Sequence, residues 1–411
     1  MSGDDPGARA LGRRIAFYRS QRGLSQRDFA AMIDRSETWV SQVERGARRI
    51  DRMTMLRRVA DVLGVPLGEL AADTPVVAAV HQRPEPAVAL RMLLSSSLAL
   101  GLAVQPPAQP VDLEQARAEV ARAWELAHAA DYERLLPLLT ELIPRLEAAT
   151  RTAKGAARRS AGAALARAYH ATAAALAKLG ESDAAWVAAD RAIGVAEHVG
   201  DRLLMAEGAF RLVLVFQADR RHDQAEHTAM TAIDALVPLV AAGDPAAVSV
   251  QGVLWLQAAL ISARRNDADA AHQRLAQARQ LGGRLGEGRD DHDTEFGPTN
   301  VAIQEVAVLV ELGDAGSALR AAARIDTGGV SPERQARLLI DVARAHLQRH
   351  HPEQAVRALI DAEELTPEQV RRHRLVRSLL LDLARTPMRT DSALRELAAR
   401  CGLTLSHRPA L

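Results

Sequence analysis

Features that mark secreted and membrane proteins are almost absent from this 411-residue sequence. Cys401 is the single cysteine, so the chain cannot form an internal disulfide, which favours a reducing cytoplasm. No N-terminal stretch combines basic residues with an apolar run, so we expect no signal peptide. The mostly apolar stretch 88–104 is interrupted by an arginine and three serines, and is too short and polar for a membrane span. We therefore expect a cytoplasmic protein with no membrane partner.

Motifs that carry catalysis or hold a cofactor are also missing. There is no Walker loop, and Gly286 and Gly288 do not follow a strand as a dinucleotide fingerprint would. The acidic stretch 290–295 contains His292, but no second histidine stands at ligand spacing, so we interpret it as a solvated loop. We expect neither an enzyme nor a bound metal or cofactor.

The composition narrows the fold class further. Aromatic residues make up only 3% of the chain, while hydrophobic residues make up 48%, so the core is built mainly from small and aliphatic side chains. That balance suits closely packed helices. The formal net charge of +1 points to no polyanion, and the length is enough for two or three domains.

What the sequence does contain is a capped pair of short helices near its N-terminus. Ser25 is placed to cap a helix over 26–33, and residues 34–36 make a tight turn. A second helix, which Ser36 can cap, is expected over 37–45, ended by Gly46. Further helices are expected over 10–22, 54–63 and 66–70.

This pattern resembles the helix-turn-helix of the lambda-repressor and Cro family, the Xre type. Gln26 opens the first helix as the family's glutamine does, Ala30 is its small contact residue, and 43–46 match its V-E-R-G ending. Asp34 departs from the family's glycine, although aspartate tolerates a left-handed backbone better than most residues. The resemblance implies a five-helix DNA-binding domain over 1–75.

The resemblance also assigns roles to polar residues. The family pairs an arginine with a glutamate, here Arg19 with Glu44, which we interpret as structural. The partner would be double-stranded DNA, contacted from the outer face and the flanks of the second helix. The expected base-reading residues are Thr38 and Gln42, with Ser41 and Glu37 nearby, and the other expected DNA contacts are Gln26, Arg35, Arg45 and Arg48.

Five prolines mark residues 76–111 as a linker that contains an apolar helix. That helix either docks on its own protein, which we favour, or forms a dimer contact. From 112 to 386 helix follows helix, and a last helix and tail are expected over 387–411.

Turn-like breaks recur within 112–386 about every 37 to 47 residues. They lie at 179–185, 220–225, 265–271, 312–318 and 349–355, with a half-match at 130–136. Alanines seven residues apart follow most of them, at 185/192, 225/232, 271/278 and 355/362. The pattern resembles a degenerate tetratricopeptide (TPR) array, so the predicted fold is all-α: the DNA-binding domain followed by a TPR-like α-solenoid. An irregular helical bundle is the alternative.

A polar loop, 282–300, interrupts this array. Asn300 and Gln304 share one face of the helix that follows it, and Arg264 precedes the previous turn. We predict that these three residues contribute to a site that binds an effector, either a peptide or a small molecule.

A helix-turn-helix followed by a TPR-like array resembles the peptide-responsive quorum-sensing regulators of Gram-positive bacteria. It resembles more closely a set of actinomycete regulators of similar length, which share the FGPTN stretch at 296–300 and ELGD at 311–314. The resemblance implies a homodimeric, sequence-specific transcriptional regulator whose repeats mediate dimerisation and bind an effector. The alternative is a protein-interaction adaptor whose helix-turn-helix has lost DNA binding. Glu37 favours that alternative because a carboxylate repels phosphate, although it can also accept from cytosine N4.

Overall fold

The structure is a computed structural model that describes residues 6–46, 50, 53–65, 85–94, 111–386, 391–403 and 405. Among them are α-helices, one 3-10 helix and turns, and no β-strand. The chain divides into two compact units, residues 1–79 with 402–411, and residues 80–401. The predicted all-α fold, a helix-turn-helix unit followed by a TPR-like solenoid, is confirmed.

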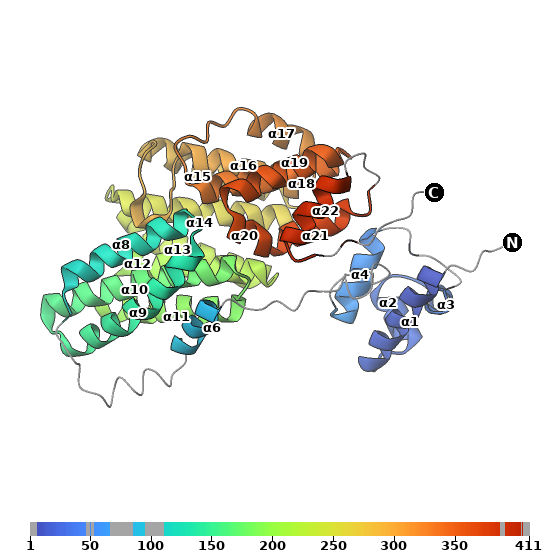
Figure 1. Ribbon diagram of the computed structural model, residues 1–411, viewed down its shortest axis with the longest axis horizontal. Coiled ribbons are helices and arrows are strands. Elements are labelled where there is room, and N and C mark those ends of the chain that lie inside the picture. The colour runs from blue at the N-terminus through green and yellow to red at the C-terminus, as the bar shows by residue number, and fades with distance from the viewer. Residues whose placement is uncertain are drawn as a thin grey trace. The chain divides into compact units, whose positions relative to one another are not determined.

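The N-terminal unit has four described helices, blue in Figure 1. They are α1 (Pro6–Gln21), α2 (Gln26–Met32), α3 (Glu37–Glu44) and α4 (Met53–Leu63). Their apolar faces meet in one core, whose buried members include Ile15, Phe29, Ile33, Val40, Val43, Leu56 and Val59. The fifth predicted helix, over 66–70, lies outside the described residues.

Gly12 lets α1 cross very close to the C-terminal end of α3. A Cβ at this position would lie 2.3 Å from the carbonyl oxygen of Val43 and 2.6 Å from that of Glu44. Both are backbone atoms, which cannot turn aside as a side chain can. Any residue larger than glycine would therefore push α1 away from α3, a constraint that the sequence pattern did not reveal.

The second unit begins with α6 (Glu85–Leu93), the described part of the linker helix. It packs on α9, with Ala87 and Leu90 fully buried, and Arg91 forms an ion pair with Glu181. The linker helix therefore docks on its own chain. Most of the remaining linker lies outside the described residues.

Six helix pairs follow, each joined by a short turn. They are α8 (Leu113–His128) with α9 (Tyr132–Thr152), α10 (Gly155–Lys178) with α11 (Ser182–Val199), α12 (Arg202–Ala218) with α13 (His222–Ala241), α14 (Pro245–Arg264) with α15 (Ala268–Leu285), α16 (Pro298–Glu311) with α17 (Ala315–Ala322), and α18 (Pro332–Gln348) with α19 (Pro352–Leu365). The 3-10 helix η1 (Asp291–Asp293) lies in the loop before α16, and the unit ends with α20 (Pro367–Arg372), α21 (Arg374–Leu383) and α22 (Asp391–Arg400).

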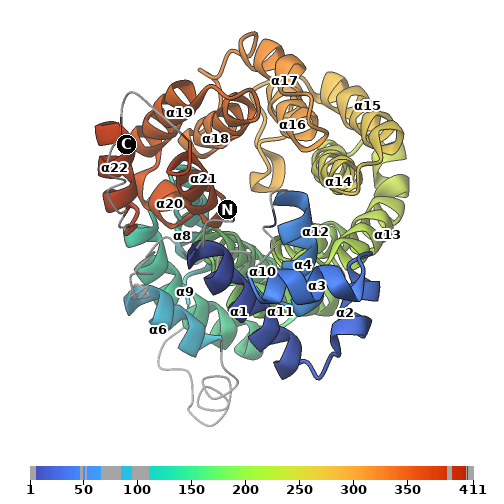
Figure 2. The ribbon, with the colours of Figure 1, turned by 90° about the vertical axis from the view of Figure 1, so that its right-hand side faces the viewer.

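The first helix of each pair packs on the first helix of the next pair. These first helices, such as α14, α16 and α18, therefore line the inside of a curved array, and α15, α17 and α19 lie outside them (Figure 2). The curvature brings the two ends together, because α18 contacts α8 and the Tyr132 hydroxyl lies 3.4 Å from Gln369 Oε1. Lys178 at the end of α10 also pairs with Glu333 at the start of α18.

One backbone device recurs at the turn inside all six pairs. A residue with left-handed backbone ends the first helix, and the next amide donates back across the turn to the last helical turn, as in the Schellman motif. The left-handed residues are Ala130, Gly180, Arg220, Asn266, Gly313 and His350. The repeated geometry confirms the five predicted turns and the half-match at 130–136.

The alanines that follow these turns are buried, as close packing between the helices of a pair requires. They are Ala185, Ala192, Ala225, Ala232, Ala271, Ala278, Ala355 and Ala362. The position equivalent to the second alanine is Ile325 in the fifth pair, and α17 has already ended at Ala322. The break in the pattern therefore reflects a shortened helix.

One described helix, α14, is long and apolar enough to cross a membrane by length and composition alone. In this structure 89% of that stretch is buried inside the protein. Its hydropathy follows from its central place in the array, where it packs on α12, α13, α15 and α16.

Candidate nucleic-acid interface and repeat interior

The turn between α2 and α3 has the geometry that the sequence predicted. Asp34 adopts a left-handed backbone with φ of 57°. Ser25 Oγ accepts from the Asp28 amide at 3.1 Å, and Ser36 Oγ accepts from the Trp39 amide at 3.2 Å. Both helices thus begin with a side-chain cap, which fixes where α3 starts.

A buried ion pair holds the other end of α3. Arg19 Nε donates to Glu44 Oε1 at 2.6 Å, and Nη2 donates to Oε2 at 3.0 Å. Arg19 Nη1 also donates to the Leu24 carbonyl at 2.7 Å, and the Glu44 side chain is only 6% exposed. The hydrogen bond to Glu44 raises the pKa of Arg19. The predicted structural role of the Arg19–Glu44 pair is confirmed.

Gln26 takes part in the same arrangement, which the sequence analysis did not anticipate. Its Nε2 donates to Glu44 Oε2 at 2.6 Å, so its amide links the start of α2 to the end of α3. An amide group has a second N–H and an oxygen left over. The phosphate contact that we expect from Gln26 therefore stays a prediction, with this bond fixing where the side chain lies.

The outer face of α3 is polar and open. Glu37 and Thr38 are exposed, and Ser41 and Gln42 are half-buried. Within the described part of the chain, none of these four side chains makes a hydrogen bond or ion pair. Four donors and acceptors on successive turns of one helix face are thus free to meet another molecule.

The predicted arginines at the two ends of α3 make contacts within the unit. Arg35 Nη1 donates to the Asp34 carbonyl at 2.9 Å, and its guanidinium lies 5.9 Å from the centroid of the Trp39 ring. Arg45 Nε donates to the Ser41 carbonyl at 3.2 Å, a contact typical of a basic residue at a helix C-terminus. Arg48 lies outside the described residues. This contact between Arg35 and the Trp39 ring was not predicted, although Trp39 lies close to the turn in the sequence.

In the second unit a chain of polar contacts crosses the inner helices. Gln217 on α12 donates to Gln257 on α14 at 2.9 Å, and Arg264 Nη1 donates to Gln217 Oε1 at 2.8 Å. Arg264 Nε reaches Glu311 at the end of α16 at 3.2 Å, and Arg344 on α18 reaches the same carboxylate at 3.2 Å. Of the predicted effector residues, Arg264 therefore faces inward and links three inner helices.

The other two predicted effector residues differ from each other. Asn300 Nδ2 donates to the Glu295 carbonyl at 3.0 Å, so its amide ties down the loop that precedes α16. Gln304 is 6% exposed, and among the described residues neither its Oε1 nor the Oδ1 of Asn300 has a hydrogen-bond partner. A buried amide oxygen without a partner is costly, so both residues are candidates for a ligand contact, and they differ in that Asn300 Nδ2 is already engaged with the loop.

The loop 286–297 contains the acidic stretch 290–295, and it is not the solvated loop that we expected there. Its last part turns inward, where Asp293, Thr294 and Phe296 are buried. Arg167 on α10 donates to Asp293 at 2.6 Å, and Arg334 on α18 lies 3.4 Å from Glu295. The prediction of a solvated loop was wrong because the arginines that pair with these carboxylates come from helices far away along the chain.

The backbone of this loop is strained and clamped. His292, Asp293 and Glu295 all have left-handed backbone, with φ of 54°, 54° and 48°. The Phe296 ring packs on Gly252 of α14 so closely that a Cβ there would lie 2.1 Å from it. Such strain persists only where surrounding contacts over-determine the conformation.

Glu207 on α12 is the centre of these contacts. His170 Nδ1 lies 2.7 Å from its Oε1, and His292 Nδ1 lies 2.9 Å from its Oε2. Burial alone would raise the pKa of Glu207, but the two histidines outweigh it and hold that pKa well below its usual range. Burial opposes protonation of His292, yet its hydrogen bond to Glu207 prevails and raises the pKa of His292. The described residues contain no cluster of metal-ligating side chains.

Comparison with known proteins gives a match for the N-terminal unit. A family model described as a helix-turn-helix domain matches residues 10–72. No curated protein sequence matches the chain. Among solved structures, the chain is similar to Bacillus thuringiensis PlcR, which was crystallised with the peptide PapR7 and DNA. The sequence identity is 14% and the TM-score is 0.30, and the match covers 67% of this chain and 95% of PlcR. The chain is also similar to aspartyl phosphate phosphatase F from Bacillus subtilis, at 12% identity and a TM-score of 0.46, covering 89% and 96%. The segment that resembles a helix-turn-helix domain, residues 10–72, therefore includes α3 and its open polar face.

Proposed function

We propose that this chain is a cytoplasmic transcriptional regulator of the Xre type that binds double-stranded DNA by sequence, and is not an enzyme. The observation that carries the proposal is the open polar face of α3, held in place by the Arg19–Glu44 pair. A recognition helix needs both features: free side chains to read base edges, and a rigid mounting that presents them.

The docking follows from the chemistry of that face. Thr38 and Gln42 lie one turn apart, so both side chains point to the same side of the helix. In the major groove a glutamine amide can pair with the N6 and N7 edge of adenine, and Glu37 can accept from cytosine N4. Ser41 would lie beside them. The side chains that would contact the phosphate backbone of the DNA are those of Gln26, Arg35, Arg45 and Arg48.

The test is binding of the purified full chain to DNA from upstream of its own gene, across a series of salt concentrations. A regulator should bind with sequence preference and lose affinity steeply as salt increases, because phosphate contacts release counterions. Failure to bind any DNA at low salt would favour the adaptor alternative.

Gln42→Ala is expected to relax base preference at one position in each half-site by about 1–3 kcal/mol. The amide is lost, while the cap and the buried pair of α3 remain. Binding to a panel of single-base operator variants measures this, with Gln115→Ala in the second unit as the control. Unchanged base preference and affinity would show that Gln42 does not read DNA.

We also propose a homodimer, because one such domain covers too little DNA for tight specific binding. The linker helix α6 and the repeats would hold it, and exposed Val88 on α6 supports this. Sedimentation should find residues 1–75 monomeric and the full chain dimeric. A monomeric full chain at micromolar concentration would contradict the dimer.

For the effector we propose the inner face around Gln304 and Arg264, with a peptide or small molecule as the ligand. The buried, unpaired Oε1 of Gln304 supports the site, because a ligand N–H would satisfy it.

Gln304→Ala should abolish a ligand-dependent thermal shift found in a peptide and metabolite screen. Asn300→Ala should instead lower the melting temperature without ligand, because Asn300 Nδ2 holds the loop. Equal stabilisation of Gln304→Ala and the unmodified protein by the same ligand would place the site elsewhere.

A further inference from the structure

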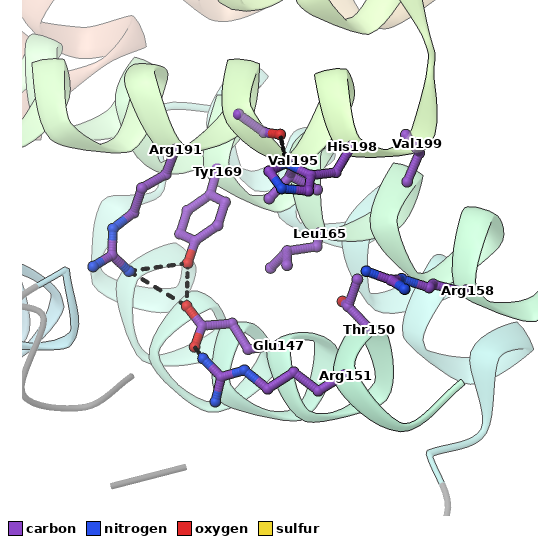
Figure 3. A pocket seen from close by; sticks show the side chains of 11 residues that line it. Glu147, Thr150, Arg151, Arg158, Leu165, Tyr169, Arg191, Val195, His198 and Val199 are labelled. Atoms are coloured by element: carbon purple, nitrogen blue, oxygen red, sulfur yellow. Dashed lines mark hydrogen bonds and ion pairs between the residues drawn. The ribbon is translucent and has the colours of Figure 1, made fainter. Parts of the chain in front are cut away.

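A cavity lies between α9, α10 and α11, on neither the face of α3 nor the inner polar chain. Its volume is about 430 Å³, within the range of small-molecule pockets. Leu165 on α10 and Val195 and Val199 on α11 supply apolar walls (Figure 3). The space is thus lined by two successive helix pairs, and a ligand there would touch both.

Gly194 borders this space. It lies inside α11, where glycine costs about 1 kcal/mol relative to alanine. The buried helix glycines elsewhere have a packing reason, because a Cβ at Gly162 or Gly208 would meet a valine or isoleucine at 2.4 or 2.5 Å. A Cβ at Gly194 would meet no atom within 4 Å, although the residue is half-buried and lines the cavity. Close packing therefore does not require this glycine, which borders free space.

One end of the cavity is polar and already organised. Glu147 is buried and accepts from the Tyr169 hydroxyl, and Arg191 Nη1 lies 3.2 Å from that hydroxyl and 3.3 Å from Glu147 Oε1. Arg151 lies 3.6 Å from the other carboxylate oxygen. Figure 3 shows these groups joined by dashed lines at one side of the cavity.

The charges around the cavity do not balance. Of the described residues that line it, three are arginines and one, Glu147, is a carboxylate. Arg151 and Arg191 are engaged with Glu147, whereas the Arg158 side chain has no hydrogen bond or ion pair within the described residues. Its guanidinium points toward the cavity beside Thr150 (Figure 3). A cation at the mouth of an apolar space favours a ligand with a negative head and an apolar body.

We propose that this cavity binds a small amphipathic anion. Its apolar body would lie against Leu165, Val195 and the backbone of Gly194, and its anionic head would pair with Arg158. The proposal does not depend on DNA binding, because all of its residues belong to the second unit.

The test uses the full chain and the dye 8-anilinonaphthalene-1-sulfonate, an amphipathic anion whose fluorescence increases in apolar surroundings. Gly194→Leu fills the cavity and should weaken saturable dye binding at least tenfold. Arg158→Glu reverses the charge at the mouth on an exposed residue whose side chain makes no hydrogen bond or ion pair with the other described residues, and should also weaken binding at least fivefold. Octanoate should displace the dye, and 1-octanol, which lacks the negative head, should not.

Two substitutions serve as matched controls. Gly283→Leu adds the same side chain at another helix glycine with open space in front of it, and Arg159→Glu makes the same charge change next to Arg158. Both should leave dye binding within twofold. Absence of saturable dye binding to the unmodified protein, equal binding by Gly194→Leu, or equal displacement by octanol would overturn the proposal. If Gly194→Leu fails to fold, the Arg158→Glu and Arg159→Glu comparison alone decides it.

Discussion

Arg19→Ala is expected to destabilise the N-terminal unit by about 3 kcal/mol, the lower end for breaking a buried ion pair from one side. The substitution leaves the Glu44 carboxylate buried with Gln26 as its one remaining side-chain partner among the described residues, and it frees the Leu24 carbonyl. Because the same pair anchors the end of α3, specific DNA binding should be lost together with stability. Hydrogen–deuterium exchange of the α1 and α3 segments in the full chain measures the change locally.

Arg13→Ala is the control for this experiment, since it removes an exposed arginine from the same helix. It should change exchange in α3 very little, because surface substitutions usually cost less than about 0.5 kcal/mol. Unchanged protection of α3 in Arg19→Ala would mean that the pair does not hold the recognition helix.

Glu207→Ala is expected to destabilise the second unit by about 3–5 kcal/mol. It removes the carboxylate that faces His170, His292 and, at 3.9 Å, the buried guanidinium of Arg211. Those groups would remain in the interior without a counter-charge, and loop 286–297 would lose an anchor. Urea unfolding of the full chain followed by circular dichroism gives the value. Glu125→Ala, at an exposed pair with Arg122, should cost less than about 1 kcal/mol.

The same site predicts a pH dependence. The pKa of His292 is raised in the folded protein, so its contribution to stability is complete below its unfolded value of about 6.5. That contribution is lost as pH rises through the folded pKa. The difference in melting temperature between the unmodified protein and His292→Gln should therefore be larger at pH 6 than at pH 9. An equal difference at both pH values would contradict the charged His292–Glu207 contact.

The sequence predicted best what depends on neighbours along the chain. The caps at Ser25 and Ser36, the left-handed Asp34 and the repeated turns are local patterns of three to six residues. The Arg19–Glu44 pair was also predicted, although 25 residues separate its members, because the family resemblance supplied the pairing.

The sequence failed where the partner lies far away along the chain. Nothing near Asp293 indicates that Arg167, 126 residues earlier, would meet it inside the curved array. Likewise Gly12 and Gly194 look alike as helix glycines, yet one permits a close crossing and the other borders a cavity. Only the three-dimensional arrangement distinguishes these two settings of a glycine.

Selection of sequences from random double-stranded DNA by the full chain tests the central claim most directly. A dimer that reads bases with α3 should enrich an inverted repeat whose half-sites are centred about 10 base pairs apart, or a multiple of that. Gln42→Ala should enrich the same repeat with one position per half-site degenerate. Recovery of sequences no different from the starting pool, under low-salt conditions in which the protein is folded, would contradict a sequence-specific regulator.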